Sequence, residues 1–139
     1  MRILIVDDEA VSLTKLQTLL AAYGDCDVAS NGEQALEMFK KAQTEAKPYT
    51  LVTMDIQMPG MNGQDTVAVI RDLEKMKMLA PTRIVMVTVA SDMKVVSTSM
   101  QSGADAFLVK PFNEESIREV VNRLSVKSKL GLKSKPPTY

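Results

Sequence analysis

The amino-acid sequence predicts an α/β fold with a doubly wound, five-stranded parallel sheet, and three observations support this class. Short apolar runs rich in Val, Ile and Leu alternate along the chain with segments of helical periodicity. The runs are continuously apolar, which is typical of strands that helices cover on both faces. A length of 139 residues and a hydrophobic content of 45% suit one globular domain with its own core.

Five apolar runs are expected to form the strands, because each stops at residues that end a strand. The first run is followed at once by the acidic triplet 7–9. The third follows Pro48 and leads into a loop that contains Pro59, Gly60 and Gly63. The expected strands are residues 2–6, 26–29, 50–54, 83–87 and 106–109.

Segments with apolar residues three and four positions apart are expected to form the five helices. Ser30 or Asn31 can cap the second helix, Asp92 the fourth and Asn113 the last. Residues 97–99 are Ser, Thr and Ser, which are poor helix formers, so the fourth helix is expected to be marginally stable. The expected helices are about 10–22, about 33–44, from beyond residue 63 to before residue 81, about 92–102 and about 114–124.

Charge and hydropathy exclude several classes of function. Residues 1–124 carry 13 bases against 17 acids, and all four bases of residues 125–139 are lysines without an accompanying acid. The acidic body has no basic patch of the kind that binds a nucleic-acid backbone. No apolar run approaches the roughly 20 residues that cross a bilayer. A cytoplasmic protein with no direct nucleic-acid or membrane contact is therefore expected.

Polar side chains follow four of the expected strands at their carboxyl ends. They are Asp7 and Asp8 after the first strand, Asp55 after the third, Thr88 after the fourth and Lys110 after the fifth. In a parallel sheet these positions share one edge, where ligands of open α/β sheets bind. Three carboxylates close together repel one another unless a cation lies among them. Oxygen ligands favour Mg²⁺, and a metal beside Lys110 and a hydroxyl group suits a phosphoryl group.

Each of these residues also has a structural interpretation. Asp8 or Glu9 can favour the start of the first helix, and Asp55 can cap a loop. Thr88 can be an ordinary β-branched strand residue and Lys110 a solvated strand end. Their joint placement on one edge nevertheless favours a site. By contrast, three other acids are interpreted as structural, because they lie in a turn or a first helical turn. These are Asp105, Glu114 and Glu115.

Several motifs in this order resemble the CheY-like receiver domain of two-component response regulators. They are Asp7-Asp8, the run Asp55-Ile56-Gln57-Met58-Pro59-Gly60-Met61-Asn62-Gly63, Thr88, and the segment 103–112 ending in Lys110-Pro111-Phe112. The resemblance covers residues 1–125 and implies a flavodoxin-like (βα)5 sheet with strand order 2-1-3-4-5. Residues 126–139 are then expected to be a basic, flexible C-terminal tail or the start of a linker.

The resemblance implies a role for each residue of the acidic edge. Asp55 is the phosphoacceptor, and Lys110 pairs with the phosphoryl oxygens. Asp8, Asp55 and the backbone carbonyl of Gln57 ligate Mg²⁺ or Mn²⁺, while Asp7 acts through water. The peptide bond between Lys110 and Pro111 is expected to be cis.

The resemblance also implies a switch, in which Thr88 turns toward the phosphoryl group and Phe107 moves inward. This repacks the face made by the fourth helix, the fifth strand and the fifth helix. Phe107 stands where Tyr is frequent and lacks its hydroxyl. Val89 is bulkier than the small residue usual there and is expected to slow transfer from small donors and loss of phosphate. Gln57 and Ala90 occupy positions that influence attack by water.

Several functional classes are compared. The leading one is a phosphorylation-controlled interaction module with no separate effector, and with no enzymatic activity beyond its own phosphorylation and dephosphorylation. The second is a receiver that is part of a longer regulator or hybrid kinase. The expected partners of such a receiver are a histidine kinase or phosphotransfer protein and a downstream protein or output domain. Phosphorylation-dependent homodimers are a further option. The enzyme alternative is an aspartyl-phosphate phosphatase of similar fold, with Asp7 as nucleophile and Glu9 as a poor proton donor. A flavin carrier is disfavoured, because acids 7–9 repel phosphate.

Overall fold

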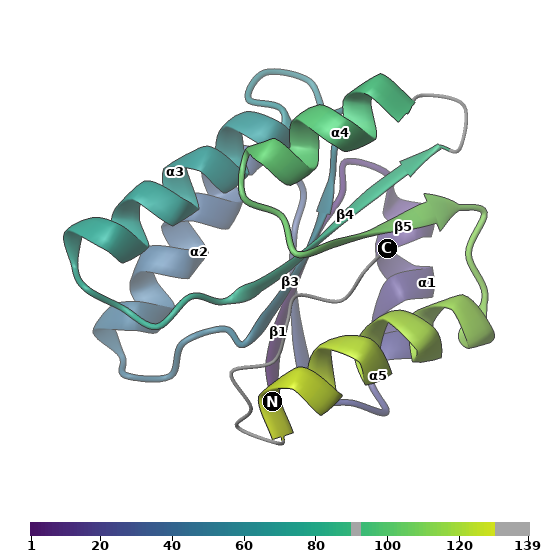
Figure 1. Cartoon of the computed structure of the whole chain (residues 1–139), viewed down its shortest axis with the longest axis horizontal. Helices are drawn as coiled ribbons and strands as arrows, with labels where there is room; N and C mark the ends of the chain where they lie inside the picture. Colours follow the sequence, from purple (N-terminus) through teal and green to yellow (C-terminus); the bar gives the residue numbers. More distant parts are fainter. Residues whose placement is uncertain (90–92, 130–139) are drawn as a thin grey trace.

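The computed structural model describes residues 1–89 and 93–129 and confirms the predicted α/β fold (Figure 1). Five strands and five helices alternate along these residues. The strands are β1 Arg2–Val6, β2 Asp25–Ala29, β3 Leu51–Asp55, β4 Arg83–Val89 and β5 Ala106–Lys110. The helices are α1 Ala10–Leu20, α2 Gly32–Thr44, α3 Gly63–Met76, α4 Met93–Gln101 and α5 Glu114–Lys129.

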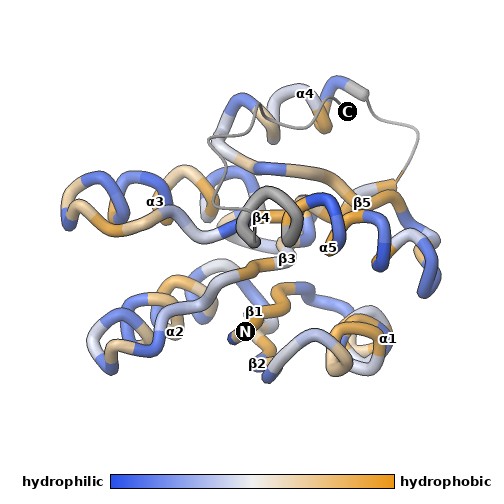
Figure 2. Tube along the Cα trace, turned by 60° about the horizontal axis from the view of Figure 1, so that its bottom comes forward, coloured by the Kyte–Doolittle hydropathy of each residue, from blue (hydrophilic) through white to orange (hydrophobic). Residues whose placement is uncertain are grey.

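All strand pairs are parallel, and the order β2-β1-β3-β4-β5 is the predicted one. Helices α1 and α5 cover one face of the sheet, with Leu16 and Val121 in its core. Helices α2, α3 and α4 cover the other face, where Phe39 and Ile70 are buried. Figure 2 shows hydrophobic colour along the strands and alternating colours along α2 and α3, as expected for helices with one buried side.

Several element ends differ from the sequence prediction, mostly by one or two residues. Strand β3 is Leu51–Asp55 instead of 50–54, so Asp55 is its last residue rather than the first residue beyond it. Strand β4 continues to Val89 instead of residue 87, because its pairing with β5 extends through Thr88 and Val89. Lys110 is consequently the last residue of β5 rather than the first residue beyond it. Helix α5 continues five residues past Leu124 to Lys129, since neither Gly nor Pro occurs before Gly131.

The helix caps follow the predicted chemistry. Asn31, rather than Ser30, caps α2, because its side chain accepts a hydrogen bond of 2.7 Å from Gln34 N. Ser30 instead donates its backbone N–H and its hydroxyl to the Gln34 side chain, which completes a reciprocal pair of bonds. Asn113 caps α5 by accepting from Ser116 N at 2.9 Å. The predicted cap of α4, Asp92, lies outside the described residues.

Helix α4 forms despite the unfavourable residues at 97–99. Thr98 and Ser99 each donate their hydroxyl to the backbone carbonyl four residues earlier, so these hydroxyls do not compete with the helix for N–H groups. Ser99 is also 1% exposed and accepts a bond from Gln64 on α3 at 3.1 Å. The same Gln64 amide donates to the Val95 carbonyl at 3.2 Å, which fastens the middle of α4 to the start of α3.

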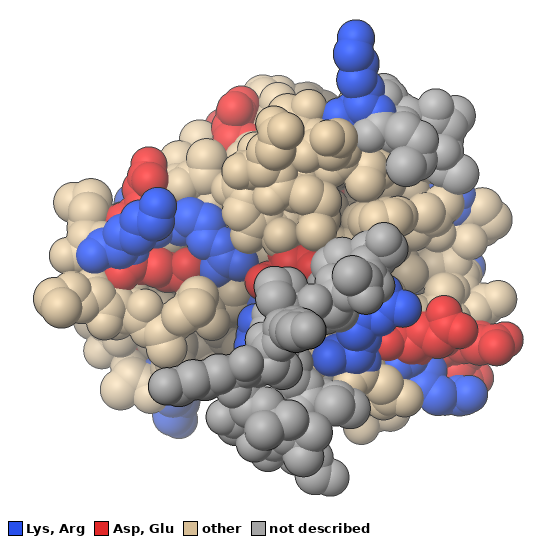
Figure 3. Space-filling model, in the orientation of Figure 1, with Lys and Arg blue, Asp and Glu red and all other residues tan. Residues whose placement is uncertain are grey.

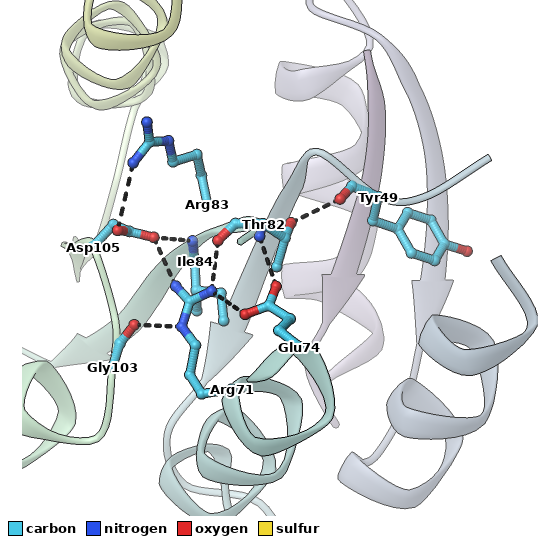
Figure 4. A network of polar contacts seen from close by, with 8 residues as sticks. All are labelled: Tyr49, Arg71, Glu74, Thr82, Arg83, Ile84, Gly103 and Asp105. Carbon is cyan, nitrogen blue, oxygen red and sulfur yellow. Dashed lines mark hydrogen bonds and ion pairs between the residues drawn. The ribbon is translucent and has the colours of Figure 1, made fainter. Parts of the chain in front are cut away.

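A polar network joins α3 to the amino ends of β4 and β5 (Figure 4). Arg71 donates to Glu74 at 2.8 Å, to Asp105 at 2.9 Å and to the carbonyls of Thr82 and Gly103. Glu74 in turn accepts from Thr82 N at 2.7 Å, although its side chain is 4% exposed. Asp105, predicted to be a turn acid, therefore belongs to a nearly buried charge network, which we call the Arg71 network.

Candidate functional site

Two strands deliver the predicted acids to one edge of the sheet. Asp7 and Asp8 directly follow β1, and Asp55 is the last residue of the neighbouring β3. Because the strands are parallel, their carboxyl ends coincide. One oxygen from each of these three carboxylates lies within 4.8 Å of the others. The structure thus places the three acids together, as the sequence predicts.

The three acids differ in their environment. Asp7 is fully buried and uses both oxygens, one accepting from Glu9 N at 2.9 Å and the other from Lys110 at 3.3 Å. Asp55 is 6% exposed, whereas Asp8 is open to solvent. The cluster is therefore closed on the side of Asp7 and open on the side of Asp8.

Lys110 is the cation of this cluster and is shared among three carboxylates. Its Nζ lies 3.3 Å from Asp7, 3.3 Å from Glu9 and 3.7 Å from Asp55. Burial alone would lower the pKa of Lys110, but the charges of Asp55 and Asp7 outweigh burial and raise it. Lys110 is thus firmly held as a cation beside Asp55.

One lysine does not compensate the negative charge. Burial, the charge of Asp7 and, less strongly, that of Asp8 raise the pKa of Asp55 to about 7, although Lys110 acts in the opposite direction. A carboxylate group in this condition favours either a proton or a further cation. The donors are oxygens only, which fits a hard divalent cation such as Mg²⁺. The residues present therefore fit a divalent metal.

A small cavity of about 130 Å³ opens beside Asp55. Thr88 lies on its wall, 6% exposed, and donates its hydroxyl to the Val89 carbonyl at 3.3 Å. Val89 lines the cavity with 48% of its surface exposed. The lining is completed by Glu9, Ile56, Gln57, Val87 and Lys110.

The remaining predicted residues lie farther from Asp55 or outside the described part. Phe107 on β5 is partly buried against the core under α2, α3 and α4, so its ring lies on the opposite face from Leu108. Ala90 is outside the described residues. The peptide bond between Lys110 and Pro111 is cis, as predicted.

Glu9 is the residue of this site that the sequence analysis missed. It was interpreted as a helix-start acid or, in the phosphatase alternative, as a poor proton donor, but its side chain makes no cap hydrogen bond and instead reaches Lys110. The two residues are 101 positions apart, so no local pattern connects them. The only sequence signal is a third acid that directly follows Asp7 and Asp8 at the same strand end.

Fold and site together define a flavodoxin-like α/β protein with a carboxylate cluster and a lysine at the carboxyl edge of its sheet. A family model described as the response regulator receiver domain matches residues 3–122. The chain belongs to this family. Among residues 1–89 and 93–129, no helix combines the length and apolar character needed to cross a membrane.

Relatives of two sizes match the chain. The chemotaxis protein CheY of Thermotoga maritima is 36% identical over 126 residues, which are 89% of this chain and 97% of CheY. The sensor histidine kinase GacS of Pseudomonas protegens is 39% identical over 121 residues, which cover 86% of this chain but only 13% of GacS. The same module thus matches both a small protein and part of a large kinase.

Solved structures agree with this assignment. The Vibrio cholerae chemotaxis protein CheY4 superimposes with a TM-score of 0.75 at 28% identity, covering 88% of this chain and 96% of CheY4. The receiver domain of Saccharomyces cerevisiae Ssk1, solved with the histidine phosphotransfer protein Ypd1, gives a TM-score of 0.80 at 25% identity. That match covers 92% of this chain and 90% of the Ssk1 chain.

Proposed function

We propose that this receiver domain accepts a phosphoryl group on Asp55 from a phosphohistidine of a histidine kinase or phosphotransfer protein. A carboxylate oxygen of Asp55 attacks phosphorus, the P–N bond to the imidazole breaks, and the imidazole nitrogen leaves with the electron pair. The observation that carries this proposal is the place of Asp55 between Lys110 and two further acids, beside a small open cavity.

Each neighbour of Asp55 has a task in this transfer. Asp7, Asp8 and the backbone carbonyl of Gln57 would hold Mg²⁺ or Mn²⁺ together with Asp55, with Asp7 acting through water. When bound, the metal supplies positive charge for the phosphoryl oxygens. Lys110 binds a phosphoryl oxygen by leaving one of its present carboxylate partners.

Asp55 suits the role of nucleophile better than Asp7, the candidate of the phosphatase alternative. Both oxygens of Asp7 accept hydrogen bonds, and its side chain has no exposed surface. Asp55 lines the cavity, and 9% of its side-chain surface is exposed. A phosphodonor can therefore reach Asp55 but not Asp7, which favours a receiver without separate enzymatic activity.

Phosphorylation is proposed to act through Thr88 and Phe107. The Thr88 hydroxyl, now bonded to a neighbouring carbonyl, turns toward the phosphoryl group and lets Phe107 move inward. The face of α4, β5 and α5 then repacks and contacts a partner, an output domain or a second copy of the chain. Figure 3 shows a largely uncharged area over α4 between charged side chains over α3 and α5, which suits a switchable contact. Residues 126–129 continue α5 beyond the proposed receiver, residues 1–125, and residues 126–139 would form a basic C-terminal tail or the start of a linker.

Intact-mass measurement tests the proposal directly. The protein is incubated with Mg²⁺ and acetyl phosphate, and wild type is compared with Asp55→Ala and with Asp72→Asn, which changes an exposed acid of α3. Wild type and Asp72→Asn should gain one labile phosphoryl group, and Asp55→Ala should gain none. No adduct on wild type, or the same adduct on Asp55→Ala, would overturn the proposal.

The switch is tested separately with beryllofluoride, which stands in for a phosphoryl group on a carboxylate. In the presence of Mg²⁺ it should change amide hydrogen exchange in β4, α4 and β5. The Asp55→Ala variant should show no change. Helix α2 follows β2, the strand at the opposite edge of the sheet from β5. A response of the same size in α2 would contradict a switch confined to this face.

A further inference from the structure

Glu9 has a position that helix capping does not explain. It precedes α1 with an extended backbone, φ −98° and ψ 120°, yet its carboxylate accepts no bond from the first turn of the helix. Instead, Oε1 lies 3.3 Å from Lys110 Nζ across the mouth of the cavity. The side chain is 66% exposed and lines the same cavity as Asp55.

The charges of the site show what Glu9 adds. Asp7, Asp8 and Asp55 carry three negative charges, which a divalent cation and Lys110 would balance completely. Glu9 then leaves the mouth of the loaded site with one excess negative charge. An approaching anion meets this charge before it reaches Asp55, and a dianion is repelled twice as strongly as a monoanion.

Glu9 also competes for the ammonium group of Lys110. Asp7 and Asp55 are buried and cannot withdraw, whereas Glu9 can turn into solvent. A phosphoryl oxygen that approaches Lys110 therefore replaces Glu9 first. The contact between Glu9 and Lys110 is the one that must break before transfer.

We propose that Glu9 is a positioning residue that acts through Lys110 and selects phosphodonors by charge, so that transfer from small dianionic donors is slowed more than transfer from monoanionic ones. This inference rests on the proposed function of Asp55. With acetyl phosphate, Asp55 attacks phosphorus, the P–O bond breaks, and acetate leaves with the electron pair. With phosphoramidate, the P–N bond breaks and ammonia leaves.

The test compares the two donors, because acetyl phosphate is a dianion near neutral pH and phosphoramidate a monoanion. Phosphorylation rates in Mg²⁺ are measured for wild type, Glu9→Gln, Glu9→Asp and the control Glu37→Gln, an exposed acid on α2. Glu9→Gln removes one charge about 6 Å from the donor, at a place where the dielectric constant is close to that of water. It should therefore speed phosphoryl transfer from acetyl phosphate about tenfold and from phosphoramidate about threefold. Glu9→Asp keeps the charge, and Glu37→Gln removes a distant one. Both variants should therefore keep the wild-type ratio of the rate with acetyl phosphate to the rate with phosphoramidate.

Two further measurements separate charge from packing. The advantage of Glu9→Gln with acetyl phosphate should shrink at about 1 M salt, where screening acts within about 3 Å. In metal-free protein, the ¹⁵N resonance of the Lys110 ammonium should shift in Glu9→Gln and stay unchanged in Glu37→Gln. This second readout needs neither metal nor phosphodonor and reports the contact itself.

The outcomes distinguish this inference from the proposed function. Equal acceleration with both donors, unchanged rates in Glu9→Gln, or an unshifted Lys110 resonance would overturn the role of Glu9 while leaving Asp55 as phosphoacceptor. Failure of wild type to accept phosphate from either donor would overturn the proposed function and the inference together. A donor ratio that changes about threefold only in Glu9→Gln supports the inference.

Discussion

Two charge clusters lie at opposite edges of the same sheet and differ in how well their charges are matched. In the Arg71 network, one guanidinium meets two carboxylates and two carbonyls at 2.8–2.9 Å (Figure 4). At the carboxyl edge, the single ammonium of Lys110 is spread over three carboxylates at 3.3–3.7 Å, and Asp8 adds a fourth acid. The first cluster is complete within the protein, whereas the second requires charge from outside.

This difference separates a structural cluster from a functional one. Arg71 presents its donors in a fixed fork, which favours short bonds to carboxylates and holds α3 against β4 and β5. Lys110 carries a point charge that can move among partners, which suits a site where a phosphoryl oxygen replaces one of its carboxylate partners. Burial is the main cause that raises the pKa of Asp55 to about 7, and the charges of Asp7 and Asp8 raise it further although Lys110 acts in the opposite direction.

The largest expected effect concerns the Arg71 network. Arg71→Ala leaves Glu74 and Asp105 without their main partner and should cost about 3–5 kcal/mol of unfolding free energy, measured by urea denaturation. The control Arg83→Ala removes a more exposed ion pair of 3.8 Å to the same Asp105 and should cost at most about 1 kcal/mol. Equal losses in the two variants would show that the Arg71 network is not a special support of the fold.

In the carboxylate cluster around Asp55 and Lys110, removing a negative charge should stabilise the metal-free protein. The folded state raises the pKa of Asp55 from 3.8 to about 7, so its proton is held more tightly than in the unfolded chain, and stability is lost as the pH rises through this range. Asp55→Asn cannot ionise. It should exceed wild type by about 2 kcal/mol near pH 8, roughly half of the full linkage value because water reaches the site.

The pH dependence provides the check on this second prediction. Denaturation in EDTA is measured between about pH 4 and pH 8, and the advantage of Asp55→Asn should vanish toward the acidic end. Asp72→Asn, on the exposed face of α3, should follow wild type throughout. A constant advantage across the range would mean that the ionisation of Asp55 is not its cause.

Two buried threonines extend the comparison to single side-chain hydrogen bonds. Thr82, within the Arg71 network, donates its hydroxyl to the Tyr49 carbonyl at 2.8 Å. Thr53 on β3, two residues before Asp55, has the one buried side-chain polar atom without a hydrogen-bond partner in the described part of the chain. Thr53→Val should therefore raise the unfolding free energy by about 1 kcal/mol, and Thr82→Val should lower it by about 1–2 kcal/mol. Thermal denaturation of both variants measures the two signs, and loss of stability in Thr53→Val would contradict this account.

The sequence predicted the fold and most of the site for one physical reason. Continuous apolar runs and their stop residues define a parallel sheet, and a parallel sheet places Asp7, Asp55 and Lys110 on one edge without further information. Strand and helix ends were less predictable, because β4 is lengthened by its pairing with β5.

Contacts between distant residues could not be predicted from local patterns. Glu9 meets Lys110 across 101 positions, and Arg71 meets Asp105 across 34. Both acids have ordinary local interpretations, at a helix start and in a turn. Only the assembled sheet shows that one of them joins the complete cluster and the other the mismatched one.

The smallest expected effect concerns access to the mismatched cluster. Val89 is 48% exposed beside the cavity and extends β4 to the level of Lys110 on β5. Val89→Ala should speed both phosphorylation by acetyl phosphate and the later loss of phosphate about threefold, which corresponds to less than 1 kcal/mol in each barrier. Intact-mass time courses measure the two rates, with Val11→Ala, an exposed position on α1, as the control. Because Val89 carries no charge, its effect should be the same for acetyl phosphate and phosphoramidate, in contrast to that of Glu9. Unchanged rates would show that the charge of the mouth, and not its width, limits entry to Asp55.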